Sequence, residues 1–363
     1  MGGHARIAQA IAWGLTAAEP AVEIQIVDIY SAPYVGRRVA FTTNAYDRFV
    51  ARAPWLWGAV FYASRPRPMV GLVRRVGSRL TRRTPLRRLV VEEAPDVIVS
   101  VISDLGQLGV LPTMARRRPP VVTVVSDLVN IHRGWLSPQA DLILVPTEPA
   151  YEACRRYKVP LEKLKLVGYP VRSHLFCQEA LAAGPRLPGG LRILFMGGSS
   201  GSGRMEDHIA ALVAAGVRLE ITAVCGKNGR LQRRLAALAA EAPAGVKLEP
   251  LGYTERIPQL MREADVLITK AGPSTLFEAI VCRLPAILTA HLPGQEGGNA
   301  QFFERAGVAV SSSGPAHTAR LAASFAADPS LLDRLRQPQL AQQTCAATPR
   351  IAEIILEQAG SRR

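Results

Sequence analysis

The chain has 363 residues, 48% of them hydrophobic, and a formal net charge of +15. This length suits two domains with a sizeable core, and the composition excludes a disordered chain. The positive charge favours an anionic partner, which leaves nucleic acid, an anionic membrane surface and phosphorylated substrates as candidates.

The cysteines and the apolar runs indicate where the protein resides. Five scattered cysteines without a C-x-x-C pair argue against a disulfide framework or a zinc site and fit a reducing cytosol. The first residues lack the pattern of a signal peptide, and no apolar run reaches the roughly 18 residues of a spanning helix. We therefore expect a cytoplasmic protein that is at most peripheral on the inner face of the cell membrane.

Short β-branched runs alternate with helical patterns along the whole chain. In the first half, the predicted strands are 23–30, 96–103, 121–127, 142–147 and 163–169. In the second half, they are 191–198, 219–226, 246–253, 266–272, 285–290 and 307–312. Runs that are apolar on both faces suit buried parallel strands between helices. Two such series predict an α/β chain with two doubly wound domains.

A segment rich in alanine, glycine and proline separates the two series. It predicts an N-terminal domain over 1–176, a linker over 177–190 and a C-terminal domain over 191–345. The last residues, 346–363, predict a helix that could pack back across the cleft between the domains.

One basic segment, 65–88, breaks the alternation because it holds nine arginines and no acidic residue. Its apolar residues follow helical spacing, and between them stand Arg74, Arg75, Arg79, Arg82 and Arg83. Such a helix can lie in a membrane interface and attract anionic headgroups. The alternative is a solvated helix whose apolar stripe packs on its own domain.

A turn rich in hydroxyl groups follows the predicted strand 266–272. Ser274 and Thr275 can donate to phosphate oxygens, the helix start favours an anion, and Lys270 adds a positive charge. Glu278, one turn further on, can accept from vicinal hydroxyls such as those of a ribose. The alternative is an ordinary capped helix with an acid in its first turns.

A second glycine-rich turn, "LFMGGSSGSGRM" (194–205), follows the first strand of the same domain. It matches neither the P-loop nor the dinucleotide-binding fingerprint, so the ATPase and dehydrogenase interpretations are weak. Two such turns on the carboxyl ends of strands in one sheet are typical of a nucleotide site.

The stretch "LITKAGPSTLFEAIVCRLPAILTAHLPGQEGGNA" (267–300) resembles the nucleotide-sugar signature of the diacylglycerol glycosyltransferases. This family comprises the plant-type monogalactosyldiacylglycerol synthases and the bacterial processive diacylglycerol glucosyltransferases, and it is related to the peptidoglycan-precursor N-acetylglucosaminyltransferase. Further blocks resemble the family at 1–11, 121–159, 166–176, 223–231 and 251–261.

The resemblance implies the GT-B arrangement, in which two Rossmann-like domains face an interdomain cleft. The C-terminal domain would bind a UDP-sugar, and the N-terminal domain would bind the lipid acceptor. Relatives begin with a strand and a fuller glycine-rich loop, whereas this sequence starts at Met1-Gly2-Gly3-His4. We therefore expect the first strand of the N-terminal sheet to be missing.

The resemblance also implies roles for individual donor-binding residues. The residues expected to line the diphosphate are Gly198, Ser199, Ser200, Lys270, Gly272, Ser274 and Thr275. Glu278 would hold the ribose hydroxyls, and Gly226 and Tyr253 would lie near the uracil. Gln295 and Glu296 would address the donor hexose, with Asn299 close by.

For the base that deprotonates the acceptor hydroxyl, His4 is the first choice, because it occupies the Gly-Gly-His position of the family. Asp127 is the second choice, and His132 could orient the acceptor. The alternatives are a solvated terminal histidine, a helix cap and a loop histidine, respectively. The donor half has no D-x-D motif, so we predict no metal requirement and no cofactor.

These features predict an inverting glycosyltransferase that moves a hexose from UDP-glucose or UDP-galactose to diacylglycerol or a related lipid at an anionic membrane surface. One alternative keeps the fold but uses another acceptor or acts as a sugar-nucleotide epimerase. Another is a basic lipid- or nucleic-acid-binding protein with a degenerate site. Only 6% aromatic residues and the absence of a nucleic-acid motif argue against a nucleic-acid partner.

Overall fold

The fold was analysed in a computed structural model of the chain. The structure describes residues 3–29, 54–81, 85–104, 108, 111, 118–176, 190–197, 204–290 and 294–360. Contacts divide the chain into two compact units. The N-terminal unit comprises His4–Pro170, Leu292–Gly297 and Ala346–Arg363, and the C-terminal unit comprises Met1–Gly3, Val171–His291 and Gly298–Cys345. Most of the predicted linker, 177–189, lies outside the described residues.

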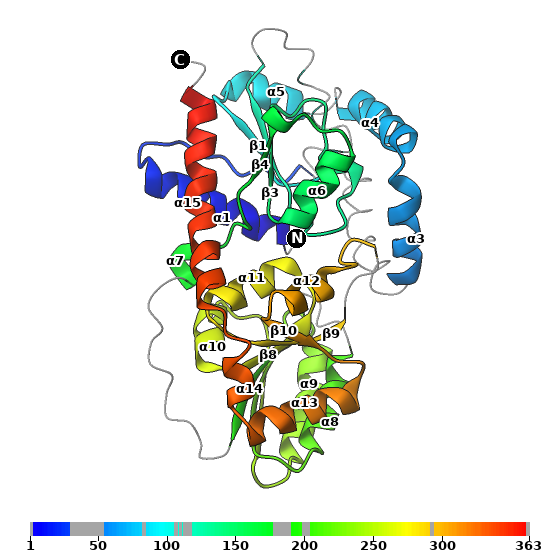
Figure 1. Cartoon of the computed structure of the whole chain (residues 1–363), viewed down its shortest axis with the longest axis vertical. Helices are drawn as coiled ribbons and strands as arrows, with labels where there is room; N and C mark the ends of the chain where they lie inside the picture. Colours follow the sequence, from blue (N-terminus) through cyan, green and yellow to red (C-terminus); the bar gives the residue numbers. More distant parts are fainter. Residues whose placement is uncertain are drawn as a thin grey trace. The chain divides into compact units, whose positions relative to one another are not determined.

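The N-terminal unit is built on a parallel four-stranded sheet of order β1-β2-β3-β4 (Figure 1). The strands are β1 (Ile98–Ser100), β2 (Val121–Val124), β3 (Leu142–Val145) and β4 (Leu164–Leu166). All residues of β2 and β3 are buried, as expected for strands covered on both faces.

The helices of the N-terminal unit come from several parts of the sequence. They are α1 (Gly3–Ala18), α3 (Pro54–Ser64), α4 (Arg67–Thr81), α5 (Pro85–Glu93), α6 (Glu148–Arg156) and the 3-10 turns η2 (Arg133–Trp135) and η3 (Leu161–Lys163). The end of the chain adds α15 (Pro338–Gly360), whose second half lies beside α1. A side chain at Gly14 would meet Thr348 at 2.9 Å, so glycine permits this close helix contact.

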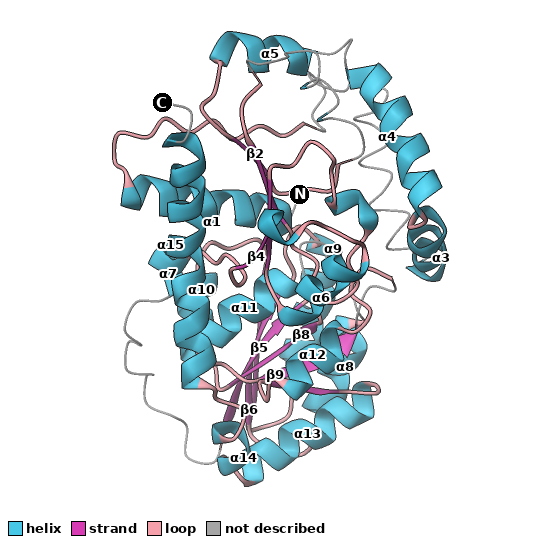
Figure 2. Ribbon diagram, turned by 45° about the horizontal axis from the view of Figure 1, so that its top comes forward, coloured by secondary structure: helices cyan, strands magenta, loops and turns pink. Residues whose placement is uncertain are grey.

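The C-terminal unit contains a parallel six-stranded sheet of order β10-β9-β8-β5-β6-β7 (Figure 2). Its strands are β5 (Leu191–Met196), β6 (Leu219–Val224), β7 (Val246–Leu251), β8 (Val266–Lys270), β9 (Ala286–Ala290) and β10 (Ala309–Ser311). Its helices are α7 (Ser173–Phe176), α8 (Met205–Val213), α9 (Gly229–Ala240), α10 (Ile257–Glu263), α11 (Pro273–Val281), α12 (Asn299–Arg305), α13 (Pro315–Ala327) and α14 (Ser330–Asp333).

The core of the C-terminal unit joins the strands to α8, α9 and α13. Ile193 and Ile268 of the sheet and Ile209 and Leu235 of the helices are among its fully buried members. Burying a side chain of this size stabilises the fold by about 1.5–3 kcal/mol. The β-α alternation predicted from the sequence is therefore confirmed in both halves.

One predicted strand, 23–30, is wrong. The described residues of this segment form no strand, and Ile24 and Ile26 are 38% and 55% exposed. A strand needs a neighbour that pairs with its backbone N–H and C=O groups. Within the described residues, β1 pairs only with β2 and offers no such ladder to this segment.

The cysteines differ in part from the sequence expectation. Cys154, Cys225 and Cys282 are free, but Cys345 is disulfide-bonded. The spacing of the cysteines in the sequence did not predict this bridge. Within the described part of the chain, none of the helices has the length and apolar character to span a bilayer.

Candidate functional site

The carboxyl edge of the C-terminal sheet carries most of the predicted donor-binding residues. Lys270 ends β8, Gly226 follows β6 and Tyr253 follows β7. These strands are parallel, so their carboxyl ends meet at one edge. Gly226 has a φ of +59° that favours glycine, and Tyr253 is 73% exposed, so its ring is available for stacking. Gly198, Ser199 and Ser200 lie outside the described residues.

The start of α11 presents backbone donors at the same edge. Gly272 is its N-cap, no side chain caps the helix, and Pro273 occupies the first turn. Ser274 and Thr275 follow and are half-buried. A helix start whose N–H groups are not used by a capping side chain is a favourable place for a phosphate.

Glu278 is held by an arginine that the sequence analysis did not single out. Its Oε1 accepts from Nη2 of Arg172 at 2.7 Å and from Nε at 3.2 Å, and Glu278 is only 2% exposed. Burial of a carboxylate is tolerated because it is paired with a guanidinium. Arg172 stands in the block 166–176 that resembles the family, and this block was the only signal for it.

Asn299 begins α12 and ties it to the turn before α11. Its Nδ2 donates to the carbonyl of Ala271 at 3.1 Å, and the residue is 1% exposed. Its Oδ1 is buried without a hydrogen-bond partner among the described residues. The C-terminal unit therefore brings together Lys270, Gly272, Ser274, Thr275, Glu278 and Asn299.

His4 lies at the first turn of α1 in the N-terminal unit. Its Nδ1 lies 2.8 Å from the carbonyl of Val101, and a carbonyl only accepts, so Nδ1 carries the proton. In the neutral ring Nε2 then holds the lone pair that a base needs. The ring lies 6.0 Å from that of Trp135, and desolvation lowers the pKa of His4 more than the bond to Val101 raises it.

Asp127 is buried, at 4% exposure, with hydrogen bonds to both carboxylate oxygens. Nε1 of Trp135 donates to Oδ2 at 2.7 Å, and Nε2 of Gln295 donates to Oδ1 at 3.2 Å. Each carboxylate oxygen thus already accepts a hydrogen bond from a side chain, which favours a structural or positioning role. The suggestion that Asp127 is an alternative base stays a prediction.

His132 is likewise engaged by its own unit. Its Nδ1 accepts from the backbone N–H of Gly134 at 3.0 Å, so Nε2 carries the proton and lies 3.2 Å from Oγ of Ser64. The ring also lies 5.2 Å from that of Phe61. With both nitrogens engaged, His132 connects α3 to the segment after β2, and its predicted contact with the acceptor gains no support.

Gln295 and Glu296 belong to the N-terminal unit although they follow β9 in the sequence. Glu296 is 7% exposed, and its charge helps to raise the pKa of Asp127. Gln295 and Glu296 therefore lie in the same unit as Asp127, whereas Lys270 and Glu278 lie in the C-terminal unit.

The titration of Asp127 gives a prediction for stability. Burial raises the pKa of its carboxyl from 3.8 to about 6, outweighing the hydrogen bonds that favour the charged form. The folded state thus binds the proton more tightly than the unfolded state, so stability should fall as pH rises from about 4 to 6. Asp127→Asn should flatten this dependence and stabilise the N-terminal unit by about 2 kcal/mol at pH 7.5.

Urea unfolding followed by tryptophan fluorescence measures this effect, because all four tryptophans lie within His4–Pro170. Asp333→Asn, at an exposed position on α14, is the matched control. Equal pH dependence in wild type and Asp127→Asn would contradict the assignment.

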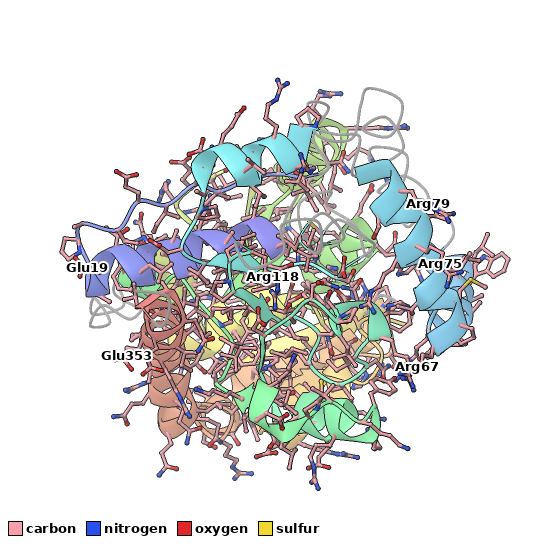
Figure 3. The ribbon with its side chains drawn as sticks, turned by 90° about the horizontal axis from the view of Figure 1, so that it is seen from above. Glu19, Arg67, Arg75, Arg79, Arg118 and Glu353 are labelled. Atoms are coloured by element: carbon pink, nitrogen blue, oxygen red, sulfur yellow. The ribbon has the colours of Figure 1, made fainter. Side chains whose placement is uncertain are left out.

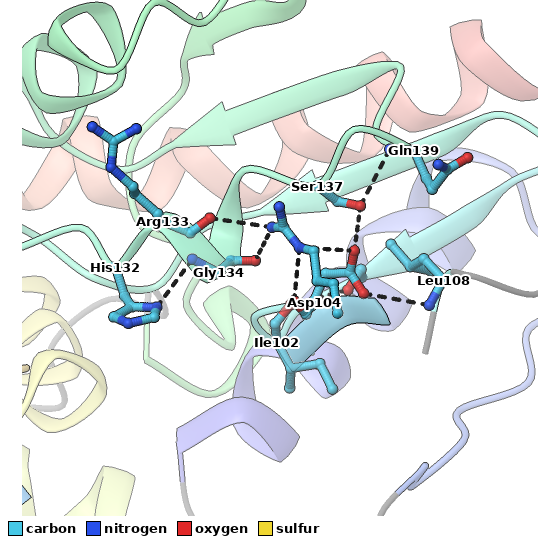
Figure 4. Close-up of polar contacts among 10 residues, drawn as sticks. Ile102, Asp104, Leu108, His132, Arg133, Gly134, Ser137 and Gln139 are labelled. Atoms are coloured by element: carbon cyan, nitrogen blue, oxygen red, sulfur yellow. Dashed lines mark hydrogen bonds and ion pairs between the residues drawn. The ribbon is translucent and has the colours of Figure 1, made fainter. Parts of the chain in front are cut away.

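Arg74 supports the interior of the N-terminal unit. Its guanidinium donates to the carbonyls of Asp104, Arg133 and Gly134 and pairs with the Asp104 carboxylate at 3.4 Å. Asp104 also accepts from Ser137, and Figure 4 shows this network beside His132. Arg74 therefore cannot serve lipid headgroups as the sequence analysis suggested.

We expect Arg74→Ala to lower the stability of the N-terminal unit by about 3 kcal/mol, because it leaves the buried Asp104 carboxylate without its cation. Arg75→Ala, at an exposed position of the same helix, should change stability by less than about 0.5 kcal/mol. Urea unfolding compares the two variants, and equal losses would refute this role for Arg74.

The remaining arginines of α4 that the structure describes face solvent. Figure 3 shows Arg67, Arg75 and Arg79 at the outer margin of the molecule. Arg82 and Arg83 lie outside the described residues. Large apolar side chains are also exposed on α3 and α4, namely Trp55, Leu56, Val60, Tyr62, Met69, Leu72, Val73 and Val76. The alternative in which the apolar stripe of α4 packs on its own domain is therefore wrong for these residues.

Comparisons with known proteins match both halves of the chain. Residues 4–171 match the monogalactosyldiacylglycerol (MGDG) synthase family, and residues 192–314 match the glycosyltransferase family 28 C-terminal domain. A processive diacylglycerol beta-glucosyltransferase of Bacillus subtilis (strain 168) is 32% identical over 233 residues, which cover 62% of this chain and 59% of that protein. Both halves of this chain are therefore similar to diacylglycerol glycosyltransferases and their relatives.

A plant protein is also similar to this chain. Monogalactosyldiacylglycerol synthase 1, chloroplastic, of Arabidopsis thaliana is 26% identical over 298 residues, which cover 76% of this chain and 54% of that protein. The matches therefore span less than two thirds of the length of either relative.

Solved structures identify the fold. The spinosyn rhamnosyltransferase SpnG, complexed with thymidine diphosphate, aligns with a TM-score of 0.59 and 15% identity over 97% of this chain and 95% of that one. The two parallel sheets with their helices are the two Rossmann-like domains of a GT-B fold.

Proposed function

We propose that this protein transfers a hexose from a UDP-sugar to diacylglycerol or a related lipid, with inversion at the anomeric carbon. The observation that carries the proposal is the cluster at the carboxyl edge of the C-terminal sheet. It combines an uncapped helix start, a lysine and a buried carboxylate. These groups match a diphosphate and a ribose.

The donor half of the reaction needs stabilisation of the departing diphosphate. The N–H groups at the start of α11, the hydroxyls of Ser274 and Thr275 and the charge of Lys270 would supply it. Glu278 would accept from the ribose hydroxyls, with Arg172 holding its carboxylate in place. Tyr253 and Gly226, at the ends of β7 and β6, would lie beside the uracil.

The acceptor half needs a base. The acceptor oxygen attacks the anomeric carbon, and the bond from that carbon to the diphosphate oxygen breaks with its electron pair on UDP. Nε2 of His4 would take the hydroxyl proton, because the bond from Nδ1 to Val101 leaves the lone pair on Nε2. This assignment agrees with the position of His4 in the segment matched to the MGDG synthase family.

We propose metal-independent catalysis, since the helix start and Lys270 can neutralise the leaving group. Within the described residues, no three His, Cys, Asp or Glu side chains gather into a possible metal site. Turnover that survives EDTA is the expected result, and loss of turnover that Mg²⁺ or Mn²⁺ restores would contradict it.

The lipid acceptor requires contact with a membrane, and α3 and α4 offer a surface for it. We call the exposed residues Trp55, Leu56, Val60, Tyr62, Arg67, Met69, Leu72, Val73, Arg75, Val76 and Arg79 the basic apolar face. Residues 54–81 contain no acid, so anionic headgroups would meet only positive charge. Exposed Trp and Tyr favour the interfacial region of a bilayer. A peripheral cytoplasmic location follows from the proposal.

Charge reversal tests this surface. Arg75 and Arg79 replaced together by Glu should weaken binding to vesicles of anionic phospholipid by roughly 30-fold or more, because each arginine contributes about 1 kcal/mol. Arg320 and Arg334, on α13 and after α14, serve as a control pair for the same change. Vesicle co-sedimentation at low salt measures binding. Unchanged binding of the Arg75 and Arg79 variant would exclude this surface.

The proposed reaction is tested by the release of UDP and the formation of glycolipid from diacylglycerol vesicles. UDP-glucose and UDP-galactose are compared, because the contacts of Gln295 and Glu296 do not separate the two hexoses. Release without any lipid acceptor would instead favour a different acceptor or the epimerase alternative.

A further inference from the structure

A short segment of the N-terminal unit holds the loop that contains Gln295. We call Gly294–Gly297 the donor loop. Nδ2 of Asn130 donates to the carbonyl of Gly294 at 3.1 Å, and Nε2 of Gln295 donates to Oδ1 of Asp127 at 3.2 Å. The backbone and a side chain of the loop are therefore both bound by the four residues 127–130.

The contact with Asp127 fixes the orientation of the Gln295 amide. An ionised carboxylate only accepts hydrogen bonds, so the NH₂ end of the amide must face it. The Gln295 carbonyl, Oε1, then points away from Asp127. The bond from Trp135 to Oδ2 holds the carboxylate in place.

Packing leaves the donor loop little room to move. A side chain at Gly297 would come within 2.8 Å of Nδ2 of Asn130, and one at Gly294 would come within 3.0 Å of the ring of Phe61. Gly294 also has a φ of +84°, which favours glycine. Both glycines thus permit the close approach of Asn130 and α3 to the loop.

We propose that Asp127 and Asn130 are positioning residues for donor recognition, which hold the donor loop so that Oε1 of Gln295 accepts from a hydroxyl of the donor hexose. This inference rests on the proposed function, because it assigns the loop to the sugar of a UDP-hexose. It replaces the role of base for Asp127 with control of the amide orientation.

The isosteric change Asp127→Asn makes the inference testable. One oxygen of the new amide would still accept from Trp135, so its NH₂ would face Gln295 and favour the opposite orientation of the Gln295 amide. The variant should fold at least as stably as wild type at pH 7.5, yet it should present NH₂ instead of Oε1 to the hexose. Asn130→Ala is the second variant, because it releases the loop at Gly294 without altering Asp127.

The experiment measures the affinities of UDP and of the UDP-hexose that wild type uses, by calorimetry, for wild type, both variants and Asp333→Asn. We expect the affinity for UDP-hexose to fall about 5- to 30-fold in both variants. Their affinity for UDP alone should stay unchanged, and Asp333→Asn should bind both ligands as wild type does. The steady-state KM for the donor should rise by the same factor, with a smaller change in kcat.

Equal UDP-hexose affinity in wild type and both variants would overturn the positioning role, even if all of them transfer hexose. A parallel loss of UDP affinity would also overturn it, because it would show a general disturbance. If wild type binds UDP-hexose but transfers no hexose to lipid, the proposed lipid acceptor is wrong, and the measured affinities still decide the positioning role of Asp127 and Asn130. If wild type binds no UDP-hexose, the proposed function and the positioning role are both wrong.

Discussion

Replacing His4 by alanine should lower kcat for hexose transfer by about 10²–10⁴-fold, the usual contribution of a general base. The physical reason is the tautomer that Val101 imposes, since the proton on Nδ1 leaves Nε2 to receive the proton of the acceptor hydroxyl. The affinity for UDP should not change, because the proposed role of His4 is to take the proton of the acceptor hydroxyl and not to bind the diphosphate.

The pH profile gives this prediction a second readout. Desolvation lowers the pKa of His4 below its ordinary value of 6.5, so the base should already be neutral at physiological pH. The rate of wild type should rise with pH through a pKa below 6.5 and then stay level, and His4→Ala should lose this limb. His317→Ala, a histidine on α13, is the control. A loss in the control equal to that in His4→Ala, or an unchanged rate in His4→Ala, would contradict the assignment.

The second large effect is expected at Glu278. Its replacement by Gln should weaken UDP-sugar binding by roughly 10²-fold, because hydrogen bonds to a charged group are worth about 1.5–3 kcal/mol each. The neutral amide cannot form the ion pair with Arg172, and Gln has one acceptor where the carboxylate has two. Binding of UDP and UDP-sugar by calorimetry measures the loss.

Measuring the stability of Glu278→Gln distinguishes a loss of UDP-sugar recognition from a loss of folding. Breaking the buried pair with Arg172 should also destabilise the C-terminal unit by about 3 kcal/mol, which circular dichroism during thermal unfolding can follow. Arg172→Met would remove the cation while keeping Glu278. We expect it to lose stability as well, and to bind UDP-sugar more weakly than wild type. Glu241→Gln, at an exposed site after α9, is the control. Full UDP-sugar affinity in a folded Glu278→Gln variant would exclude the ribose contact.

The sequence predicts the alternation of strands and helices because buried parallel strands are apolar on both faces and end at turn residues. The turn from Lys270 to Thr275 could be read in this way, since its residues are contiguous. Segment 23–30 looks like the other strands, yet its described residues stay outside the sheet, because pairing depends on a neighbouring strand and not on the segment itself.

Contacts between distant residues were beyond the sequence analysis. Arg172 and Glu278 are 106 positions apart, and Asp127 and Gln295 are 168 apart. No periodicity links such pairs, so the burial of Glu278 and the engaged carboxylate of Asp127 emerged only with the fold. The sequence analysis made no prediction for helix α3, where Trp55 is 72% exposed.

The measurement that tests the account most directly is lipid-dependent release of UDP. UDP-glucose and UDP-galactose are each incubated with the protein, with and without diacylglycerol in anionic vesicles, using wild type, Glu278→Gln and Glu241→Gln. We predict that one of the donors releases UDP only when diacylglycerol is present, equally in wild type and Glu241→Gln, and that Glu278→Gln loses this release. Folded wild-type protein that releases no UDP from either donor with diacylglycerol, or a Glu278→Gln variant as active as wild type, would contradict the account.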